Sequence, residues 1–103
     1  MANYSLLVTG QQAVLATAAA LASVGVTNPF SSSVPSGEGL EVELEALAAN
    51  TIPIYYGPAG VTDATGAELA PGARTKLKVN NLNQIYVIAS TTGATVSYRV
   101  TNL

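Results

Sequence analysis

The chain has 103 residues and a formal net charge of −2, and it contains no histidine, cysteine or tryptophan. Only 10% of its residues are charged, against about 25% in typical globular domains, and this depletion is also found where subunits bury surface against one another. Four basic residues do not make the patch of a nucleic-acid-binding protein, and a chain without cysteine forms no disulfide and no thiolate metal site. The length is that of one domain, so we expect residues 1–103 to fold as a single unit.

The first 38 residues show little regular pattern, and we expect them to form an N-terminal segment and loop that can serve as an interface arm. Tyr4–Val8 is a short apolar run that ends at Thr9-Gly10, which predicts a first strand over these residues. The alanine-rich residues 12–23 fit a strand near Gln12–Ala16 or a short helix, and we favour the strand. This apolar stretch has no preceding Lys or Arg and is too short for a membrane span, so neither export nor a membrane partner is expected.

Residues 28–39 predict a loop, because they contain two prolines, two glycines and four serines. Phe30 and Val34 are the large apolar side chains of this loop. They either pack back onto the core or contact a partner, and we include them among the candidate interface residues.

Two rows of like charge follow, each at a spacing of two residues. The acidic row is Glu41, Glu43 and Glu45, and the basic row is Arg74, Lys76 and Lys78. Both alternate with mainly apolar residues, which is typical of half-buried strands with the charges outward. On neighbouring strands the rows would form an ion ladder within the chain; on opposite sides of the subunit they would meet between chains. We favour the ladder, and we expect no metal, because carboxylates about 7 Å apart cannot all ligate one calcium ion.

The remaining pattern predicts further short strands. Ile52–Tyr56 reads as a strand at an edge or with a bulge, because Pro53 cannot donate a hydrogen bond to a neighbour. Turns are expected at Thr65-Gly66 and at Ala70–Gly72. Gln84–Ala89 is apolar on both faces and predicts a central strand, and Val96–Val100 alternates as the last one. The whole predicts an all-β fold, a small antiparallel β-sandwich of jelly-roll or Ig-like type with about six to eight short strands and its core in residues 39–103.

Chemistry-bearing residues are scarce. Proton-transfer catalysis most often uses histidine, which the chain lacks. Glu38, Asp63 and Glu68 lie in or beside glycine-containing turns, where solvated side chains are usual. No nucleophile elbow, phosphate-binding loop or dinucleotide fingerprint is present, so we expect no enzyme and no cofactor. Tyr55 points to the opposite face from Ile54 and is a candidate interface residue, since tyrosine is enriched at interfaces.

From Ala46 onward the sequence resembles a module common among small virion proteins of tailed bacteriophages. The resemblance rests on Ala49-Asn50-Thr51, Tyr55-Tyr56-Gly57, Val61-Thr62, Leu69-Ala70-Pro71-Gly72, Asn81-Leu82 before Ile85–Ile88, and Val96-Ser97-Tyr98. Members of this group are β-sandwich proteins that coat or complete virions. This chain departs from the pattern at Ile52-Pro53 and in its basic strand after Gly72.

The resemblance implies a structural virion protein that decorates or cements a capsid through subunit contacts. It implies the major capsid protein and copies of the chain itself as partners, with a trimer as the expected homo-oligomer. The expected location is the capsid exterior, after synthesis in the host cytoplasm. A neck, tail or baseplate component and a sugar-binding sandwich for host recognition are the alternatives. The candidate interface residues are Glu41, Glu43, Glu45, Arg74, Lys76, Lys78, Phe30, Val34 and Tyr55.

Overall fold

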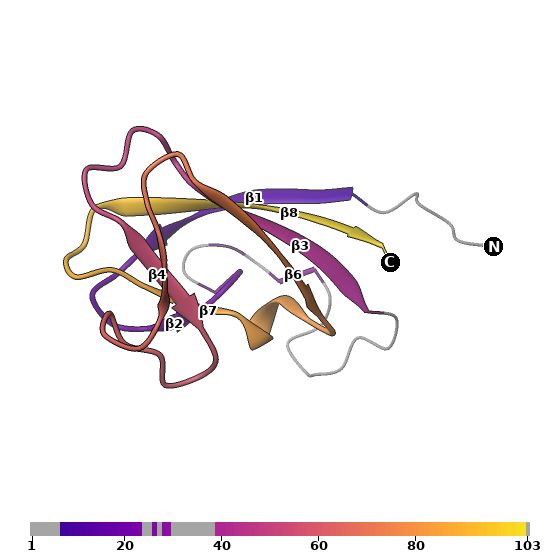
Figure 1. Ribbon diagram of the computed structural model, residues 1–103. Coiled ribbons are helices and arrows are strands. Elements are labelled where there is room, and N and C mark those ends of the chain that lie inside the picture. Colours follow the sequence, from indigo (N-terminus) through magenta and orange to yellow (C-terminus); the bar gives the residue numbers. More distant parts are fainter. Residues whose placement is uncertain (1–6, 24–25, 27, 30–38, 103) are drawn as a thin grey trace.

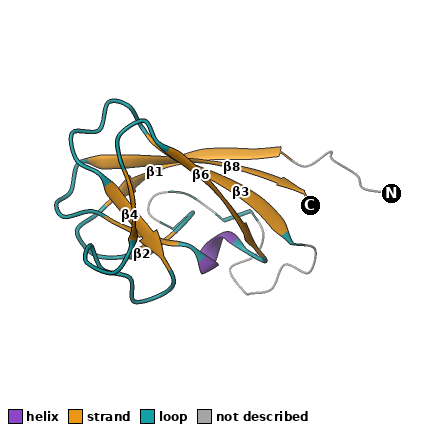
Figure 2. Cartoon of the chain, in the orientation of Figure 1, coloured by secondary structure: helices purple, strands orange, loops and turns teal. Residues whose placement is uncertain are grey.

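A computed structural model describes residues 7–23, 26, 28–29 and 39–102 (Figure 1). Over these residues the chain forms short strands and one 3-10 turn (Figure 2). The elements in chain order are β1 (Leu7–Val14), β2 (Ala19–Ala20), β3 (Leu40–Ala46), β4 (Ile54–Gly57), β5 (Ala67–Leu69), β6 (Arg74–Val79), η1 (Leu82–Gln84), β7 (Tyr86–Ile88) and β8 (Ala94–Asn102). The 3-10 turn η1 is capped by Asn81, whose side chain accepts a hydrogen bond from the Asn83 N–H, while the Gln84 side chain accepts one from the backbone N–H of Asn81.

The strands form two four-stranded sheets in which every pairing is antiparallel. Sheet A has the order β1-β8-β3-β6, and sheet B has the order β2-β7-β4-β5. The pairs β1·β8, β2·β7, β3·β6 and β4·β5 are nested, as in one long hairpin rolled into two sheets, which is the jelly-roll arrangement. The predicted antiparallel β-sandwich is therefore confirmed, and the jelly roll is selected over the Ig-like alternative.

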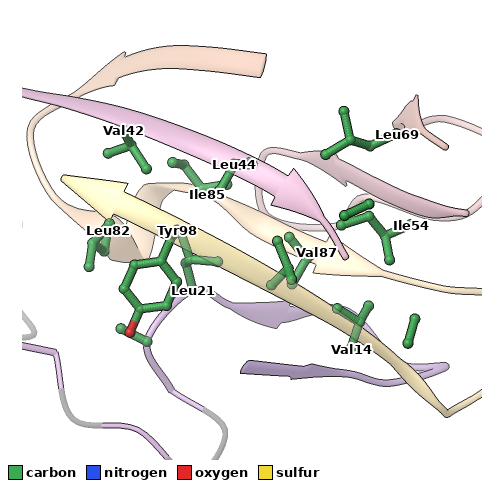
Figure 3. Packing of buried hydrophobic residues seen from close by; sticks show 14 of the residues in the cluster. Val14, Leu21, Val42, Leu44, Ile54, Leu69, Leu82, Ile85, Val87 and Tyr98 are labelled. Carbon is green, nitrogen blue, oxygen red and sulfur yellow. The ribbon is translucent and has the colours of Figure 1, made fainter. Parts of the chain in front are cut away.

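The core fills the space between the two sheets (Figure 3). β3 alternates strictly between buried and half-buried positions, so Leu40, Val42 and Leu44 point inward and the acidic row points outward. The inward side chains of sheet B, such as Ile54 and Val87, meet them. The other large core residues are Val14, Leu21, Leu69, Leu82, Ile85, Val96, Tyr98 and Val100.

The amide side chains of Gln12, which is buried, and Asn50, which is half-buried, join parts of the sandwich that strand pairing does not connect. Gln12 of β1 donates from Nε2 to the carbonyl of Ala20 at 3.0 Å and accepts from the N–H of Ser23 at 3.0 Å, so it ties an edge of sheet A to an edge of sheet B. Asn50 donates to the Thr95 carbonyl at 2.9 Å and accepts from the Thr95 N–H at 3.0 Å, as a neighbouring strand would. Such bonds satisfy backbone groups that would otherwise lose their partners on burial.

Several predictions for the first half of the chain need correction. The predicted end of the first strand at Thr9-Gly10 is wrong, because β1 runs without interruption from Leu7 to Val14. Gly10 lies opposite Tyr98, and a Cβ atom on Gly10 would lie 2.5 Å from the Tyr98 Oη, so the glycine makes room for a ring rather than for a bend. β1 and β2 also belong to the two sheets, so the sandwich does not begin at residue 39.

The favoured strand near Gln12–Ala16 is confirmed in part, since Gln12–Val14 lies in β1 while Ala16 lies beyond it. The edge position predicted from Pro53 is wrong: β4 starts after the proline and pairs with β5 on one side and β7 on the other. The turn at Ala70–Gly72 is confirmed by a bond from the Ala73 N–H to the Ala70 carbonyl at 2.8 Å and by a positive φ of 86° at Gly72.

The second half of the chain also gives a pH prediction. Tyr98 is 2% exposed, and burial raises the pKa of its phenol above the ordinary value of 10.0. The unfolded chain loses this proton near pH 10 while the folded chain retains it, so the contribution to stability is full below pH 10 and falls as pH rises through the folded-state pKa. We expect the midpoint of urea unfolding to drop above pH 10, and to drop less in Tyr98→Phe.

Tyr55→Phe serves as the matched control, because Tyr55 is only half-buried. This variant is expected to keep the full alkaline loss of stability. An identical alkaline loss in Tyr98→Phe would show that burial of this phenol does not matter.

Candidate interface on the outer face of sheet A

The two charged rows lie side by side on neighbouring strands. In the β3·β6 pairing, Glu41 is opposite Lys78, Glu43 is opposite Lys76 and Glu45 is opposite Arg74. On the other side of β3, the register places Arg99 of β8 opposite Glu43. Seven of the ten charged residues of the chain are therefore gathered on the outer face of sheet A. The alternative in which the rows lie on opposite sides of the subunit and meet only between chains is ruled out by this register.

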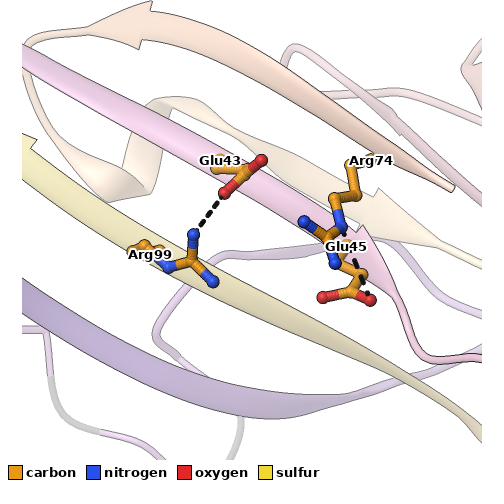
Figure 4. A network of polar contacts seen from close by, with 4 residues as sticks. All are labelled: Glu43, Glu45, Arg74 and Arg99. Atoms are coloured by element: carbon orange, nitrogen blue, oxygen red, sulfur yellow. Dashed lines mark hydrogen bonds and ion pairs between the residues drawn. The ribbon is translucent and has the colours of Figure 1, made fainter. Parts of the chain in front are cut away.

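The ion pairs differ from the simple ladder (Figure 4). Arg99 Nη1 donates to Glu43 Oε1 at 2.8 Å, while Arg74 Nε lies 3.7 Å from Glu45 Oε2. Glu43 thus bonds to β8 rather than to Lys76 of β6. The Arg99 side chain is 54% exposed and that of Glu43 is 19% exposed, so each pair contributes about 0.2–1 kcal/mol, as exposed pairs do.

This choice of partners leaves positive charge at one edge of the sheet. Within the described part of the chain, no carboxylate lies within 4.0 Å of the ammonium groups of Lys76 and Lys78. Both residues are exposed on β6, which is the last strand of sheet A. Charges of this kind attract an oppositely charged partner and orient it during encounter.

Sequence reasoning missed Arg99 as a member of this face. The alternation of Val96, Tyr98 and Val100 already indicates that Ser97 and Arg99 point outward. What the alternation does not indicate is that β8 lies next to β3, a pairing between residues far apart in the sequence.

A polar depression of about 240 Å³ lies on the outer face of sheet A. It forms where the short side chains of Thr9 and Ser97 lie beside the longer side chains of Glu43, Glu45 and Arg99. The residues around it are Thr9, Glu43, Glu45, Ser97, Tyr98 and Arg99. Two of its charged residues, Arg99 and Glu43, already form an ion pair with each other. No group of three potential metal ligands occurs among the described residues.

A second groove, of about 250 Å³, is mainly apolar and lies beside β6. It exists because sheet B does not cover β6 as it covers β3: the inward residues Thr75, Leu77 and Val79 stay half-buried, whereas those of β3 are buried. The groove is lined by Tyr56, Gly57, Pro58, Leu77, Lys78, Val79, Gln84 and Ile85.

The other candidate interface residues do not join this face. Tyr55 lies on β4, opposite Glu68 and Ile88, and points away from the core on sheet B. Val61 from the following loop packs near it, and a Cβ on Gly57 or Gly66 would lie 2.8 Å or 2.9 Å from the Val61 Cγ2. Phe30 and Val34 lie outside the described residues. Of the helical segments that the structure describes, none is long and apolar enough to cross a membrane.

Comparisons with known proteins identify a related fold but no family. No family model matches the chain, and no curated protein matches it. Among solved structures, it is similar to a protein of the Bacillus endospore appendages, described as a novel family of disulfide-linked pili. That similarity covers 98% of this chain and 88% of the other, with a TM-score of 0.59 and 16% sequence identity. At this identity the match supports the fold, and the cysteine-free sequence has no counterpart of the disulfide link.

Proposed function

We propose that this protein is a structural subunit that decorates or cements a bacteriophage capsid, with no catalytic activity and no cofactor. The observation that carries the proposal is the gathering of seven of ten charged residues on one face of a jelly roll. The resemblance from Ala46 onward to small phage virion proteins supports the same role. The partners are the major capsid protein and further copies of the chain, in a trimer, on the capsid exterior after synthesis in the host cytoplasm.

The physical basis is that complementary charge fixes orientation while repetition supplies strength. A charged face contributes more to the choice of partner and to the rate of encounter than to affinity. A modest contact becomes effective when subunits are linked and bind several sites at once. A trimer that presents the outer face of sheet A three times would gain in this way.

The copy number of the 10.4 kDa chain in purified virions tests the proposal. Quantitative mass spectrometry against the major capsid protein is expected to give about one copy per capsid subunit or a simple fraction of it, as symmetric assemblies require. A handful of copies per particle would assign the protein to the neck, tail or baseplate, and absence from virions would overturn the proposal.

A second candidate, favoured by the structural similarity to the endospore appendage protein, is a subunit that polymerises with itself into a filament. Head-to-tail contacts that do not close into a ring generate such filaments. Electron microscopy of the purified chain alone separates the two functions. Discrete particles of one size support a capsid subunit, while filaments support an appendage.

A further inference from the structure

The outer edge of β6 offers backbone groups for hydrogen bonding. β6 pairs with β3 on one side, and no strand of the described residues pairs with it on the other. The Ala46 N–H donates to the carbonyl of Ala73 at 3.0 Å, one step beyond the register pair Glu45↔Arg74. Hydrogen-bonded and non-hydrogen-bonded pairs alternate in antiparallel sheets. The residues of β6 that bond β3 are therefore Thr75, Leu77 and Val79.

The same alternation assigns the outward backbone groups to the basic row. Arg74, Lys76 and Lys78 direct their N–H and C=O groups toward the open edge. The bond from Leu47 N–H to Thr95 O at 3.3 Å, on the opposite side of β3, agrees with this assignment. The residues that offer backbone bonds to a new strand thus also carry the positive charges.

We propose that the outer edge of β6 is a docking site for an extended acidic segment of a partner protein, which adds to sheet A as a further strand. The inference rests on the proposed function, because it specifies which kind of partner segment the subunit binds in that role. Acidic side chains of the segment lie beside Lys76 and Lys78, which have no carboxylate within 4.0 Å among the described residues. Its alternate apolar side chains fill the groove that Tyr56, Leu77 and Val79 help to line.

Charge also argues against a second copy as the occupant. Antiparallel pairing of β6 with β6 of another copy sets cations directly opposite cations, which is destabilising. The other edge of sheet A, β1, carries no charge on its exposed residues Thr9, Gln11 and Ala13, so it gives the cations no partner. An extended acidic segment would both form hydrogen bonds with the outward backbone groups of β6 and pair with its positive charges.

The test uses a peptide with the sequence of β3, LEVELEA, because this acidic strand already fits the register of β6. The peptide is titrated to millimolar concentration into the full chain labelled with ¹⁵N. We expect the amide signals of Arg74, Lys76 and Lys78 to shift and their hydrogen exchange to slow. The amides of Thr75, Leu77 and Val79, already bonded to β3, are expected to change less. A peptide with lysine in place of each glutamate is expected not to bind.

Two variants of one residue separate backbone from charge. Lys76→Pro removes an outward N–H without breaking a bond to β3, a position where edge strands tolerate proline, and is expected to abolish binding. Lys76→Gln keeps the N–H and is expected to weaken binding about two- to fivefold, as loss of one exposed charge contact does. Gln11→Pro, on the exposed edge of β1, is the matched control and is expected to bind as the unaltered chain does. Circular dichroism confirms that each variant is folded.

The proposal is overturned if the peptide does not bind, if Lys76→Pro binds as well as the unaltered chain, or if the lysine peptide binds equally. Sedimentation that shows self-association lost in Lys76→Pro, without peptide binding, would assign the edge to a second copy instead. Binding of the acidic peptide by a chain that is missing from virions would retain the docking site and reject the capsid function. Presence in virions without peptide binding would retain the capsid function and reject the docking site.

Discussion

Replacing Leu44 with alanine is expected to lower the free energy of unfolding by about 3 kcal/mol, within the range for buried leucines. Leu44 is 0% exposed and lies on β3, between β8 and β6 in sheet A. The truncation leaves a cavity between the sheets that surrounding strands, fixed by pairing on both sides of β3, cannot fill by moving. Urea unfolding followed by circular dichroism measures the change.

Leu77 supplies the matched control, because it is the same residue type on the neighbouring strand. It is only half-buried, since sheet B covers β6 less completely than β3. Leu77→Ala is therefore expected to cost about 1 kcal/mol, in proportion to the smaller area removed from water on folding. Equal losses in the two variants would contradict the uneven cover of sheet A on which the groove depends.

Gly10→Ala is expected to destabilise the fold by about 2 kcal/mol through overpacking, and Gly10→Val by more. A Cβ atom at this position would lie 2.5 Å from Oη and 2.6 Å from Cζ of Tyr98. The ring is rigid and 2% exposed, so it cannot turn away into solvent. The midpoint of thermal unfolding and the free energy from urea unfolding measure the effect.

A double-mutant cycle with Tyr98→Leu tests the cause. When the ring is gone, the added methyl group finds space, and the penalty of Gly10→Ala is expected to fall to below about 1 kcal/mol. An unchanged penalty in the Tyr98→Leu background would mean that strand flexibility, and not the ring, explains the glycine.

The parts of the fold that could be predicted are mainly the strands in which apolar and charged residues alternate. The acidic row with Leu40, Val42 and Leu44 predicts β3 with the correct inward face. Successive side chains of a strand point to opposite faces, so the apolar residues face the core and the charged ones face outward. The basic row predicts β6 in the same way, and its pairing with β3 was the favoured alternative. The turn at Ala70–Gly72 follows from the fixed φ of proline and the positive φ that glycine permits.

What the sequence could not supply depends on neighbours distant along the chain. Gly10 indicates the end of a strand until Tyr98 is known to lie across from it. Pro53 indicates an edge strand until β4 is known to start one residue later. The predicted ladder joined the acidic row to the basic row, but β8 brings Arg99 to Glu43 at 2.8 Å. In each case the local sequence is compatible with more than one structure, and contacts with residues distant in the sequence decide which one forms.

The nested pairing of the strands also sets the order in which a newly made chain can fold. The hairpin β4·β5 closes over residues 58–66 and can form early, whereas Leu7 must wait for Thr101, its partner in β8. β8 is inserted between β1 and β3, so until β8 is translated a nascent chain holds β1 without a partner strand and β3 paired on the β6 side alone. A chain cut short before β8 exposes the whole of β1 and one edge of β3, and such exposed edges lead to aggregation. Synthesis of β8 is therefore the step that completes sheet A and covers the edges that are prone to aggregation.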